Sequence, residues 1–514
     1  MLLQALPPLA NVPIEIPLLL IDARRFAPFL SSRTESSTVK PSLIRHWIDA
    51  KPHGTESGRR FQSVNPEDGT VVAEALRGGA DDVDKAVDAA HRAAEPMAQT
   101  TPSERETILL QAAALLQRDA DEFCDLLIRE IGSPIGKAKM EIEIATRLLK
   151  ANAGITRRLT GRTYPSDIQG RWSLGFRRPI GVVAGITPFN VPLIKGVKQA
   201  STSLATGNTF VWLPSEHTPA IADRTARLFH EAGVPPGAMN VVFGDGSEIG
   251  DHLVSDARVA AVTFTGSERV GRHVQSICGA EGKRVTLELG GKNPLVVLSD
   301  ADLPTAIQAA IRGGFIYQGQ ICMASSRIIV ARSVYQAFLD GFVAAASGLS
   351  LGPLREPTTM IGPLIDSQTC DRIRERLRQA VERGAKICCG GQWSGNRLHP
   401  TVIIDVDEDM LLLREEIFGP VVTVEGANDV DHAINLAASA PGILSAAVHT
   451  ASLATAMEFA QRLPTAMLHI NDSTLQQEPE VPFGGDGASG FGREGMETAL
   501  DDFTRWQWVT MRGV

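Results

Sequence analysis

A regular alternation of short apolar runs and amphipathic stretches between residues 178 and 288 restricts the fold more than any other feature of this sequence. We expect strands at 180–186, 209–213, 239–243, 259–264 and 284–289, and helices at 191–204, 219–232, 249–254 and 270–277. Alternating strands and helices are typical of βαβ units, whose strands pair in parallel. The segment therefore predicts a doubly wound α/β sheet.

The segments on either side of this sheet have patterns of their own. Upstream, residues 81–94 and 102–131 have the periodicity of amphipathic helices that could cover one face of the sheet. Downstream, a second alternation from 294 to 466 predicts a second α/β domain, with strand-like runs at 295–298, 327–330 and 420–424. The stretch 503–511 is rich in aromatic and β-branched residues, and it predicts a strand that pairs with the sheet of a neighbouring subunit.

Length and charge limit the class of protein. A chain of 514 residues is too long for one ordinary core, so we expect at least two large domains. Lys and Arg number 50 against 59 Asp and Glu, a net charge of −9, and this excess of acid argues against nucleic acid and anionic membranes as partners. Residues 1–42 contain apolar clusters broken by prolines, without a membrane span or a signal-peptide pattern. An added docking segment and a disordered tail would both fit them.

Six cysteines are spread thinly along the chain, without the CxxC spacing that is typical of zinc sites and disulfide frameworks. We therefore predict no metal site and a reducing, cytoplasmic environment. The adjacent pair Cys388-Cys389 could form a redox device, but we favour structural thiols there.

Three polar residues stand in distinctive local contexts. Cys322 lies in the stretch FIYQGQICMASSR, Glu288 ends a predicted strand before a Gly-Gly turn, and Asn190 lies in PFNVP just after the first predicted strand. Each alone has an ordinary explanation, as a structural cysteine, a solvated acid and a helix N-cap. Together they supply what thiol-based acyl chemistry needs: a nucleophile, a base for water and an oxyanion donor.

From about residue 45 to its C-terminus the sequence resembles the aldehyde dehydrogenase superfamily. Five motifs occur in that family's order: PxNxP at 188–192, ELGGKxP at 288–294, GQxC at 319–322, EEIFGPV at 415–421 and PFGGxGxSGxGR at 482–493. The resemblance implies that the Cys322 thiolate attacks an aldehyde carbon while the Asn190 amide and the Cys322 backbone N–H hold the oxyanion. Hydride then passes to a nicotinamide cofactor, and Glu288 deprotonates the water that hydrolyses the thioester to a carboxylic acid.

The resemblance also implies a domain plan for a homodimer or homotetramer. Residues 1–42 would be an N-terminal extension, 43–155 and 176–288 an NAD-binding domain, 289–480 a catalytic domain, and 156–175 with 481–514 a small β oligomerisation element.

The same resemblance implies where the cofactor binds. The stretch FTGSERVG at 264–271 follows a strand and opens a helix, so the Ser267 hydroxyl and the helix amides can meet a pyrophosphate. Glu416 and Phe418 are implied for the nicotinamide ribose and ring, and the alternative for Glu416 is an ordinary surface acid. The implied cofactor residues are Ile186, Thr187, Pro188, Phe189, Glu216, Gly266, Ser267, Leu289, Glu416 and Phe418.

One position departs from the family pattern. Where the family usually has KPSE after the second strand, this chain has Leu213 to Glu216, so the lysine that reaches the adenosine ribose is absent. Loss of a charged hydrogen bond of about 1.5–3 kcal/mol would weaken cofactor binding by about one to two powers of ten. Glu216 remains and would bind the ribose hydroxyls and repel a 2′-phosphate, so we predict NAD rather than NADP.

The helix after Asn190 and the stretches 469–471, 503–504 and 508–510 resemble family members that act on vanillin, salicylaldehyde or benzaldehyde. We therefore expect an aromatic or other bulky apolar aldehyde as the substrate. The predicted tunnel residues are Val191, Ile194, Lys195, Lys198 and Tyr317. The two lysines could bind a hydroxyl or carboxylate of the substrate, or extend to solvent at the tunnel rim.

Three other functions fit parts of this pattern. A CoA-acylating semialdehyde dehydrogenase would form the same thioester, but Glu288 favours water as the acceptor. A cofactor-independent thiol esterase would need only the cysteine and the oxyanion donors. A catalytically silent scaffold protein of the same fold is suggested by Leu213 and the N-terminal extension, but the presence of all three polar residues argues against it.

Overall fold

Two large sheets organise residues 43–512, the part of the chain that the computed structural model describes. The expected N-terminal extension lies outside the described residues. The first sheet has the strand order β22-β12-β11-β8-β9-β10-β2-β3. Its five parallel strands are β8 (Val182–Ile186), β9 (Thr209–Leu213), β10 (Met239–Val241), β11 (Val259–Thr265) and β12 (Arg284–Glu288). The chain starts at β8 in the centre and winds outward in both directions, which confirms the doubly wound α/β fold.

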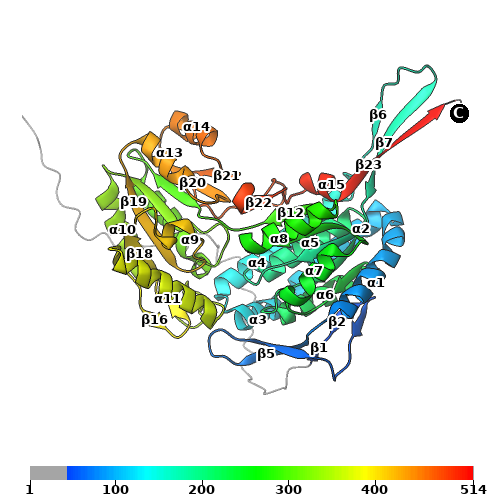
Figure 1. Ribbon diagram of the computed structural model, residues 1–514, viewed down its shortest axis with the longest axis horizontal. Coiled ribbons are helices and arrows are strands. Elements are labelled where there is room, and N and C mark those ends of the chain that lie inside the picture. The colour runs from blue at the N-terminus through cyan, green and yellow to red at the C-terminus, as the bar shows by residue number, and fades with distance from the viewer. Residues whose placement is uncertain (1–42, 513–514) are drawn as a thin grey trace, which may run out of the picture. The chain divides into compact units, whose positions relative to one another are not determined.

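Helices cover both faces of the first sheet (Figure 1). One face carries α1 (Ala80–Gln99), α7 (Gly246–Ser255) and α8 (Glu268–Ala280), and the other carries α2 (Pro102–Arg118), α3 (Ala120–Ile131), α4 (Ile135–Ile155), α5 (Pro192–Ala205) and α6 (Pro219–Glu231). Side chains alternate between these layers along each strand, as in β9, where Val211 and Leu213 face the first set and Phe210 and Trp212 the second. Both faces of the strands are therefore buried, which is why the strands are apolar throughout.

The helical layer differs from the sequence prediction at two places. The single helix expected at 102–131 is wrong, because the chain breaks at Asp119 into α2 and α3. The Asp119 carboxylate accepts hydrogen bonds from Arg118 and Arg224, and these charged contacts hold the residue between the two helices. Helix α4 was not predicted.

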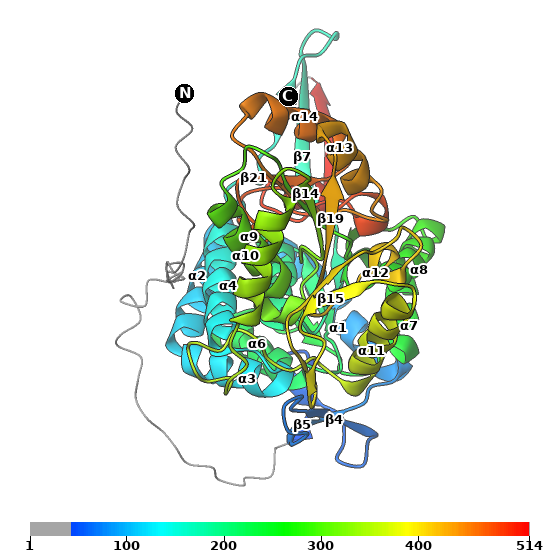
Figure 2. The same ribbon diagram turned by 90° about the vertical axis from the view of Figure 1, so that its left-hand side faces the viewer.

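The second sheet has the order β15-β18-β19-β14-β13-β20-β21, with helices on both faces (Figure 2). Its strands are β13 (Pro294–Val297), β14 (Arg327–Ala331), β15 (Lys386–Cys389), β18 (Thr401–Ile404), β19 (Val421–Ala427), β20 (Ser445–His449) and β21 (Met467–Ile470). Its helices are α9 (Leu303–Phe315), α10 (Tyr335–Ser347), α11 (Ser367–Glu382), α12 (Leu411–Arg414), α13 (Val430–Ala438) and α14 (Leu453–Arg462). All neighbours except β15 and β18 pair in parallel. This sheet and its helices form the second α/β unit that the second alternation predicted.

A third sheet, β23-β7-β6, stands out from the end of the first sheet (Figure 1). The expected strand at 503–511 is β23 (Thr504–Arg512), which pairs along its whole length with β7 (Arg171–Pro179), and β7 pairs with β6 (Arg162–Tyr164). No other strand of residues 43–512 pairs with the edge of β23 that lies away from β7.

The smaller elements complete the architecture. They are β1 (Leu43–Ile44), β2 (His46–Ile48), β3 (Lys51–His53), β4 (Arg60–Val64), β5 (Val71–Leu76), β16 (Trp393–Ser394), β17 (Arg397–Leu398), β22 (Gly490–Phe491) and α15 (Thr498–Asp502). Strand β22 joins the first sheet beside β12, although its residues were assigned to the predicted oligomerisation element. Strand β7 runs across the predicted boundary between residues 175 and 176. The domain boundaries stay a prediction. Among residues 43–512, no helix is both long and apolar enough to cross a bilayer.

Candidate active site

Cys322 lies on a loop between the short 3-10 turn η2 (Ile316–Gly319) and β14, and both ends of this loop are held firmly. The backbone reverses through left-handed φ angles of 57° at Tyr317 and 45° at Gln318. The Gln318 amide bonds the backbone of the 362–363 segment, at 2.8 and 3.2 Å. The Asn293 Nδ2 donates to the Cys322 carbonyl at 2.7 Å. The loop is thus preorganised by hydrogen bonds to two other segments, at residue 293 and at residues 362–363.

Asn190 follows β8 and reaches this loop, where its Nδ2 donates to the Gln320 carbonyl at 3.0 Å. It is not the N-cap of α5, because that position belongs to Val191. The carboxylate of Glu141, on α4, accepts the first free N–H groups of α5, from Leu193 at 3.0 Å and Ile194 at 3.3 Å. Since another residue caps the helix, the Asn190 amide is free to serve the cysteine loop.

Glu288 ends β12 and is only 2% exposed. Neither carboxylate oxygen has a hydrogen-bond partner within residues 43–512. Burial, and next the negative charge of Glu494, raise the pKa of Glu288 to about 8. A Cβ atom on Gly484 would lie 2.6 Å from Glu288 Oε1, so the missing side chain there leaves room for the carboxylate.

The structure brings Cys322, Glu288 and Asn190 together. Cys322 packs against a small apolar cluster that contains Phe483, and the next residue, Gly484, lies against Glu288. Asn190 bonds to the cysteine loop two residues before the thiol. Burial raises the pKa of Cys322 to about 12, while the positive charge of Lys195 opposes this shift. The thiol therefore needs help to ionise.

The cofactor residues predicted after β8, β11 and β12 gather where those strands end. Because β8 and β11 are neighbours from which the chain leaves in opposite directions, this edge is a topological switch point, where such sheets bind ligands. Residues Ile186 to Phe189 follow β8, Gly266 and Ser267 follow β11, and Leu289 follows β12. Ser267 is the N-cap of α8, and Thr187 Oγ1 accepts from Trp212 Nε1 at 2.8 Å. The helix start beside a glycine offers N–H groups to an anion and so fits a pyrophosphate.

Glu416 and Phe418 precede β19 of the second sheet and lie near the residues that follow β8 and β12. The Phe189 ring meets the Phe418 ring edge-on at 5.9 Å. The Glu416 carboxylate lies over Gly290, where any side chain would overlap it, and burial raises its pKa to about 7. Its Oε1 is buried without a partner in the described part of the chain. An ordinary surface acid would be solvated, so that alternative is wrong, and an unpaired acceptor fits a ribose hydroxyl.

Strand β9 ends at Leu213, the position where the family usually has a lysine. Leu213 is 2% exposed and packs in the apolar layer between β9 and α1. Glu216 is exposed, and its Oε1 lies 3.9 Å from His217 Nε2, while the His217 ring meets Phe189 edge-on at 5.6 Å. The sequence interpretation did not find His217.

The predicted tunnel residues are all buried, and the interpretation of the lysines as a solvent-exposed rim is wrong. Lys195 and Lys198 are 3% and 4% exposed. Both ammonium groups lie 2.8 Å from Oε2 of Glu494, a residue that the sequence interpretation missed although it directly follows the last family motif. Tyr317 is also buried, with Lys137 Nζ 3.7 Å from its ring centre. Val191 and Ile194 pack in the core between α5 and the neighbouring helices.

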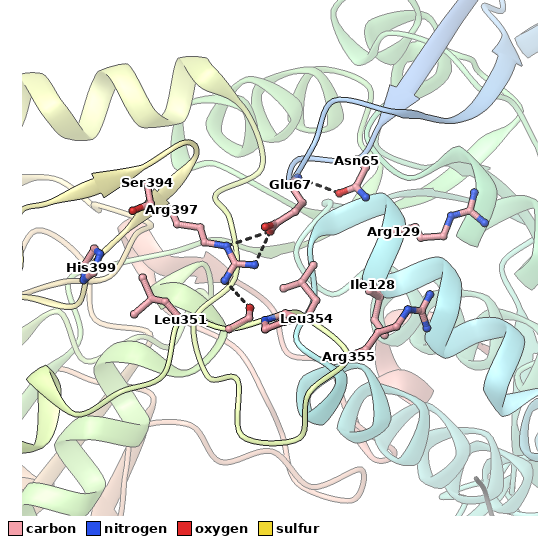
Figure 3. Close-up of a pocket in the computed structure, with 12 residues that line it drawn as sticks. Asn65, Glu67, Ile128, Arg129, Leu351, Leu354, Arg355, Ser394, Arg397 and His399 are labelled. Atoms are coloured by element: carbon pink, nitrogen blue, oxygen red, sulfur yellow. Dashed lines mark hydrogen bonds and ion pairs between the residues drawn. The ribbon is translucent and has the colours of Figure 1, made fainter. Parts of the chain in front are cut away.

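A cleft of about 820 Å³ elsewhere contains none of the predicted site residues (Figure 3). It lies between the β4–β5 turn, α3 and the β16–β17 hairpin. Arg397 crosses it, bonding Glu67 Oε2 at 2.6 Å and the Gly352 carbonyl at 2.8 Å. This arginine joins the two halves of the molecule. Within residues 43–512, no group of three or more His, Cys, Asp or Glu side chains is placed to bind a metal.

Comparison with known proteins decides the family. The model of the aldehyde dehydrogenase family matches residues 53–509. The chain belongs to this family. It is therefore an oxidoreductase that acts on aldehydes, in a family that uses nicotinamide cofactors.

Individual relatives agree with this assignment. The vanillin dehydrogenase of Corynebacterium glutamicum is 40% identical over 471 residues, which cover 91% of this chain and 97% of that protein. The crystal structure of a salicylaldehyde dehydrogenase from Pseudomonas putida G7 in complex with salicylaldehyde is 30% identical, with a TM-score of 0.89, and the match covers 91% of this chain and 98% of that one. The structure of an E. coli NADP-dependent enzyme is 32% identical, with the same TM-score and coverage.

Proposed function

We propose that this aldehyde dehydrogenase oxidises an aromatic aldehyde to the carboxylic acid, with Cys322 as nucleophile, Asn190 as oxyanion donor, Glu288 as base and NAD as hydride acceptor. The observation that carries the proposal is the Glu288 carboxylate, which is buried beside the cysteine and has no hydrogen-bond partner among residues 43–512. A base in this position favours water, rather than a second thiol, as the acceptor of the acyl group.

The residues divide the reaction into two halves. Cys322, once ionised, adds to the aldehyde carbon, and the oxyanion accepts hydrogen bonds from Asn190 Nδ2 and the Cys322 backbone N–H. When bound, the nicotinamide supplies the acceptor for the hydride that leaves this carbon. A thioester remains on Cys322. Glu288 then takes a proton from water, the water oxygen adds to the thioester carbon, and the thiolate leaves as the acid forms.

An aromatic substrate is supported by the surroundings of the thiol as well as by the relatives. Cys322 packs in an apolar cluster with Met323, Leu444 and Phe483, flanked by Ile321, Met467 and Leu475. Aromatic rings gain most from such surfaces. Measuring kcat/KM for benzaldehyde, a hydroxybenzaldehyde and propanal tests this choice, and a preference for propanal would overturn it. Acyl-CoA formation under excess CoA would favour the CoA-acylating alternative.

The choice of NAD over NADP depends on Glu216. Its carboxylate would accept hydrogen bonds from both ribose hydroxyls but would repel a 2′-phosphate. Assays with both cofactors in parallel, on the wild type and on Glu216→Gln, test this. We expect NAD to be preferred, and we expect the variant to narrow the difference.

A homo-oligomer is supported by one face of the third sheet. The register of β7 and β23 puts five apolar residues on this face: Trp172, Leu174, Phe176, Val509 and Met511. Trp172 is 63% exposed, which is unusual for so large an apolar side chain. A second copy of the chain would cover this face and the open edge of β23.

We place the protein in the cytoplasm because all six cysteines are free.

A further inference from the structure

A group of three buried charges adjoins the site described above. Lys195 and Lys198 lie one turn apart on α5, and both bind the same Glu494 oxygen at 2.8 Å. All three side chains are less than one-tenth exposed. Burial alone would raise the pKa of Glu494, but the two lysines outweigh it and lower the pKa to about 2. Burial lowers the pKa of Lys198 below that of a free lysine, whereas the pKa of Lys195 is raised. While both lysines are protonated, two ammonium groups on one carboxylate leave one surplus positive charge.

A short backbone pairing brings this group to the nucleophile. Phe483 and Glu494 exchange two backbone hydrogen bonds of 2.7 Å, so the chain between them forms a closed loop. Cys322 packs against the apolar cluster that contains Phe483, and the centre of the Phe483 ring lies 5.3 Å from Lys195 Nζ and 4.6 Å from Lys198 Nζ. Gly484, one residue on, lies against Glu288. One loop therefore joins the thiol, the base and the cations.

The charges in this region act on one another. Cys322 faces Lys195, Glu416 and Glu288, in that order of effect. Glu288 faces Glu494, Lys195, Lys198 and Arg493. The negative charges of Glu494, Glu288 and Cys322 outweigh the burial of Lys195 and raise its pKa, so this lysine stays charged. Because a negative charge on Glu288 raises the pKa of Cys322, the region favours one negative charge on the pair rather than two.

We propose that Lys195 is a positioning residue for the reaction: its share of the surplus positive charge stabilises the single negative charge that Cys322 and Glu288 carry in turn. The roles of the thiol and the carboxylate rest on the proposed function. In the first half-reaction the charge is on sulfur. In the thioester the sulfur is uncharged, so the same cation then stabilises the Glu288 carboxylate, which must be ionised to take a proton from water.

Alkylation of Cys322 by iodoacetamide tests the proposal without aldehyde or cofactor, so its result is separate from that of the proposed function. The reagent is uncharged, and peptide mass spectrometry restricts the rate to Cys322 among six cysteines. We expect Lys195→Met to move the inflection of the rate against pH upward by about one pH unit, which makes alkylation at pH 7 about tenfold slower. Lys195→Arg should restore the wild-type profile.

Lys198→Met is the matched control, because Lys198 binds the same carboxylate, whereas Lys195 is the cation with the largest effect on Cys322. It should shift the profile less than Lys195→Met. A wild-type profile for Lys195→Met, equal shifts in both methionine variants, or failure of Lys195→Arg to restore the profile would each overturn the proposal. Melting temperatures identify a variant that does not fold, and Lys195→Gln then replaces Lys195→Met.

Discussion

At the scale of single residues, the site depends on charges kept away from water. Glu288 is buried without a hydrogen-bond partner among the described residues, and its pKa is raised from 4.5 to about 8. A carboxyl group whose pKa is higher in the folded protein binds its proton more tightly there. The folded state therefore loses stability as the pH rises from about 4.5 to about 8. Ionised Glu288 at its buried position therefore destabilises the folded protein.

Glu288→Gln separates these two effects. We expect thioester hydrolysis to slow by about 10²–10⁴-fold, because the base for water is lost, so that one equivalent of reduced nicotinamide forms per site and turnover then stops. The variant should also melt at a higher temperature than the wild type above pH 8, by a difference that shrinks toward pH 4.5. The free energy of unfolding of the variant should exceed that of the wild type by at most about 5 kcal/mol. A difference in melting temperature between the two proteins that does not change with pH would contradict the burial argument.

Leu213 is the second residue with a direct test. Leu213→Lys would restore a cation beside the adenosine ribose, and we expect it to lower the Kd for NAD by about one to two powers of ten. Leu213→Met keeps the apolar packing in the layer under β9 and controls for changes of volume. Titration of NAD by calorimetry gives the Kd directly. An unchanged Kd in Leu213→Lys would show that this chain binds the ribose by other contacts.

At the scale of secondary structure, helix α5 lies on the first sheet and begins two residues after Asn190, which bonds to the cysteine loop. Its N-terminal N–H groups are capped by Glu141, which also pairs with the buried Lys137. Lys137 Nζ in turn donates to the Asn190 carbonyl at 2.8 Å. Asn190, the proposed oxyanion donor, is therefore held by a buried ion pair on another helix.

Glu141→Gln should destabilise the protein by about 3–5 kcal/mol, because Lys137 loses its buried partner. We also expect kcat to fall while the KM for NAD changes little, since Asn190 loses its fixed position. Glu143→Gln is the control, because Glu143 lies on the same helix with its side chain 56% exposed and only a loose 3.8 Å contact to Arg147. Equal melting temperatures of the two variants would refute the role assigned to the cap.

At the scale of the whole molecule, the third sheet extends away from the two large ones (Figure 1). Its apolar face and the open edge of β23 have no partner within residues 43–512. The double variant Trp172→Lys, Phe176→Lys places two charges on this face without touching the active site. We expect it to reduce the mass measured by light scattering from a multiple of 55.1 kDa to that of one chain. An unchanged multiple would place the subunit interface elsewhere.

The sequence alone determined the alternation of strands and helices in the first sheet, its doubly wound topology, and the resemblance to the family. It also indicated the residues of the proposed site, because periodicity and short motifs are local properties that adjacent residues carry together. For example, β9 has the predicted bounds, and Glu288 ends β12 one residue before the predicted strand end. The break at Asp119 and helix α4 escaped prediction because the contacts that stabilise them come from other helices.

Only the tertiary structure decided which charges meet. Lys195 and Glu494 are 299 residues apart in the chain, and Glu141 caps a helix 52 residues downstream. Neither contact leaves a local pattern, since a buried charge is tolerated only when the fold supplies its partner. In the sequence, the helical spacing of Lys195 and Lys198 was compatible with a solvent-exposed tunnel rim and also with a buried site. The Glu494 carboxylate decides between them, and with it the electrostatic surroundings of Cys322.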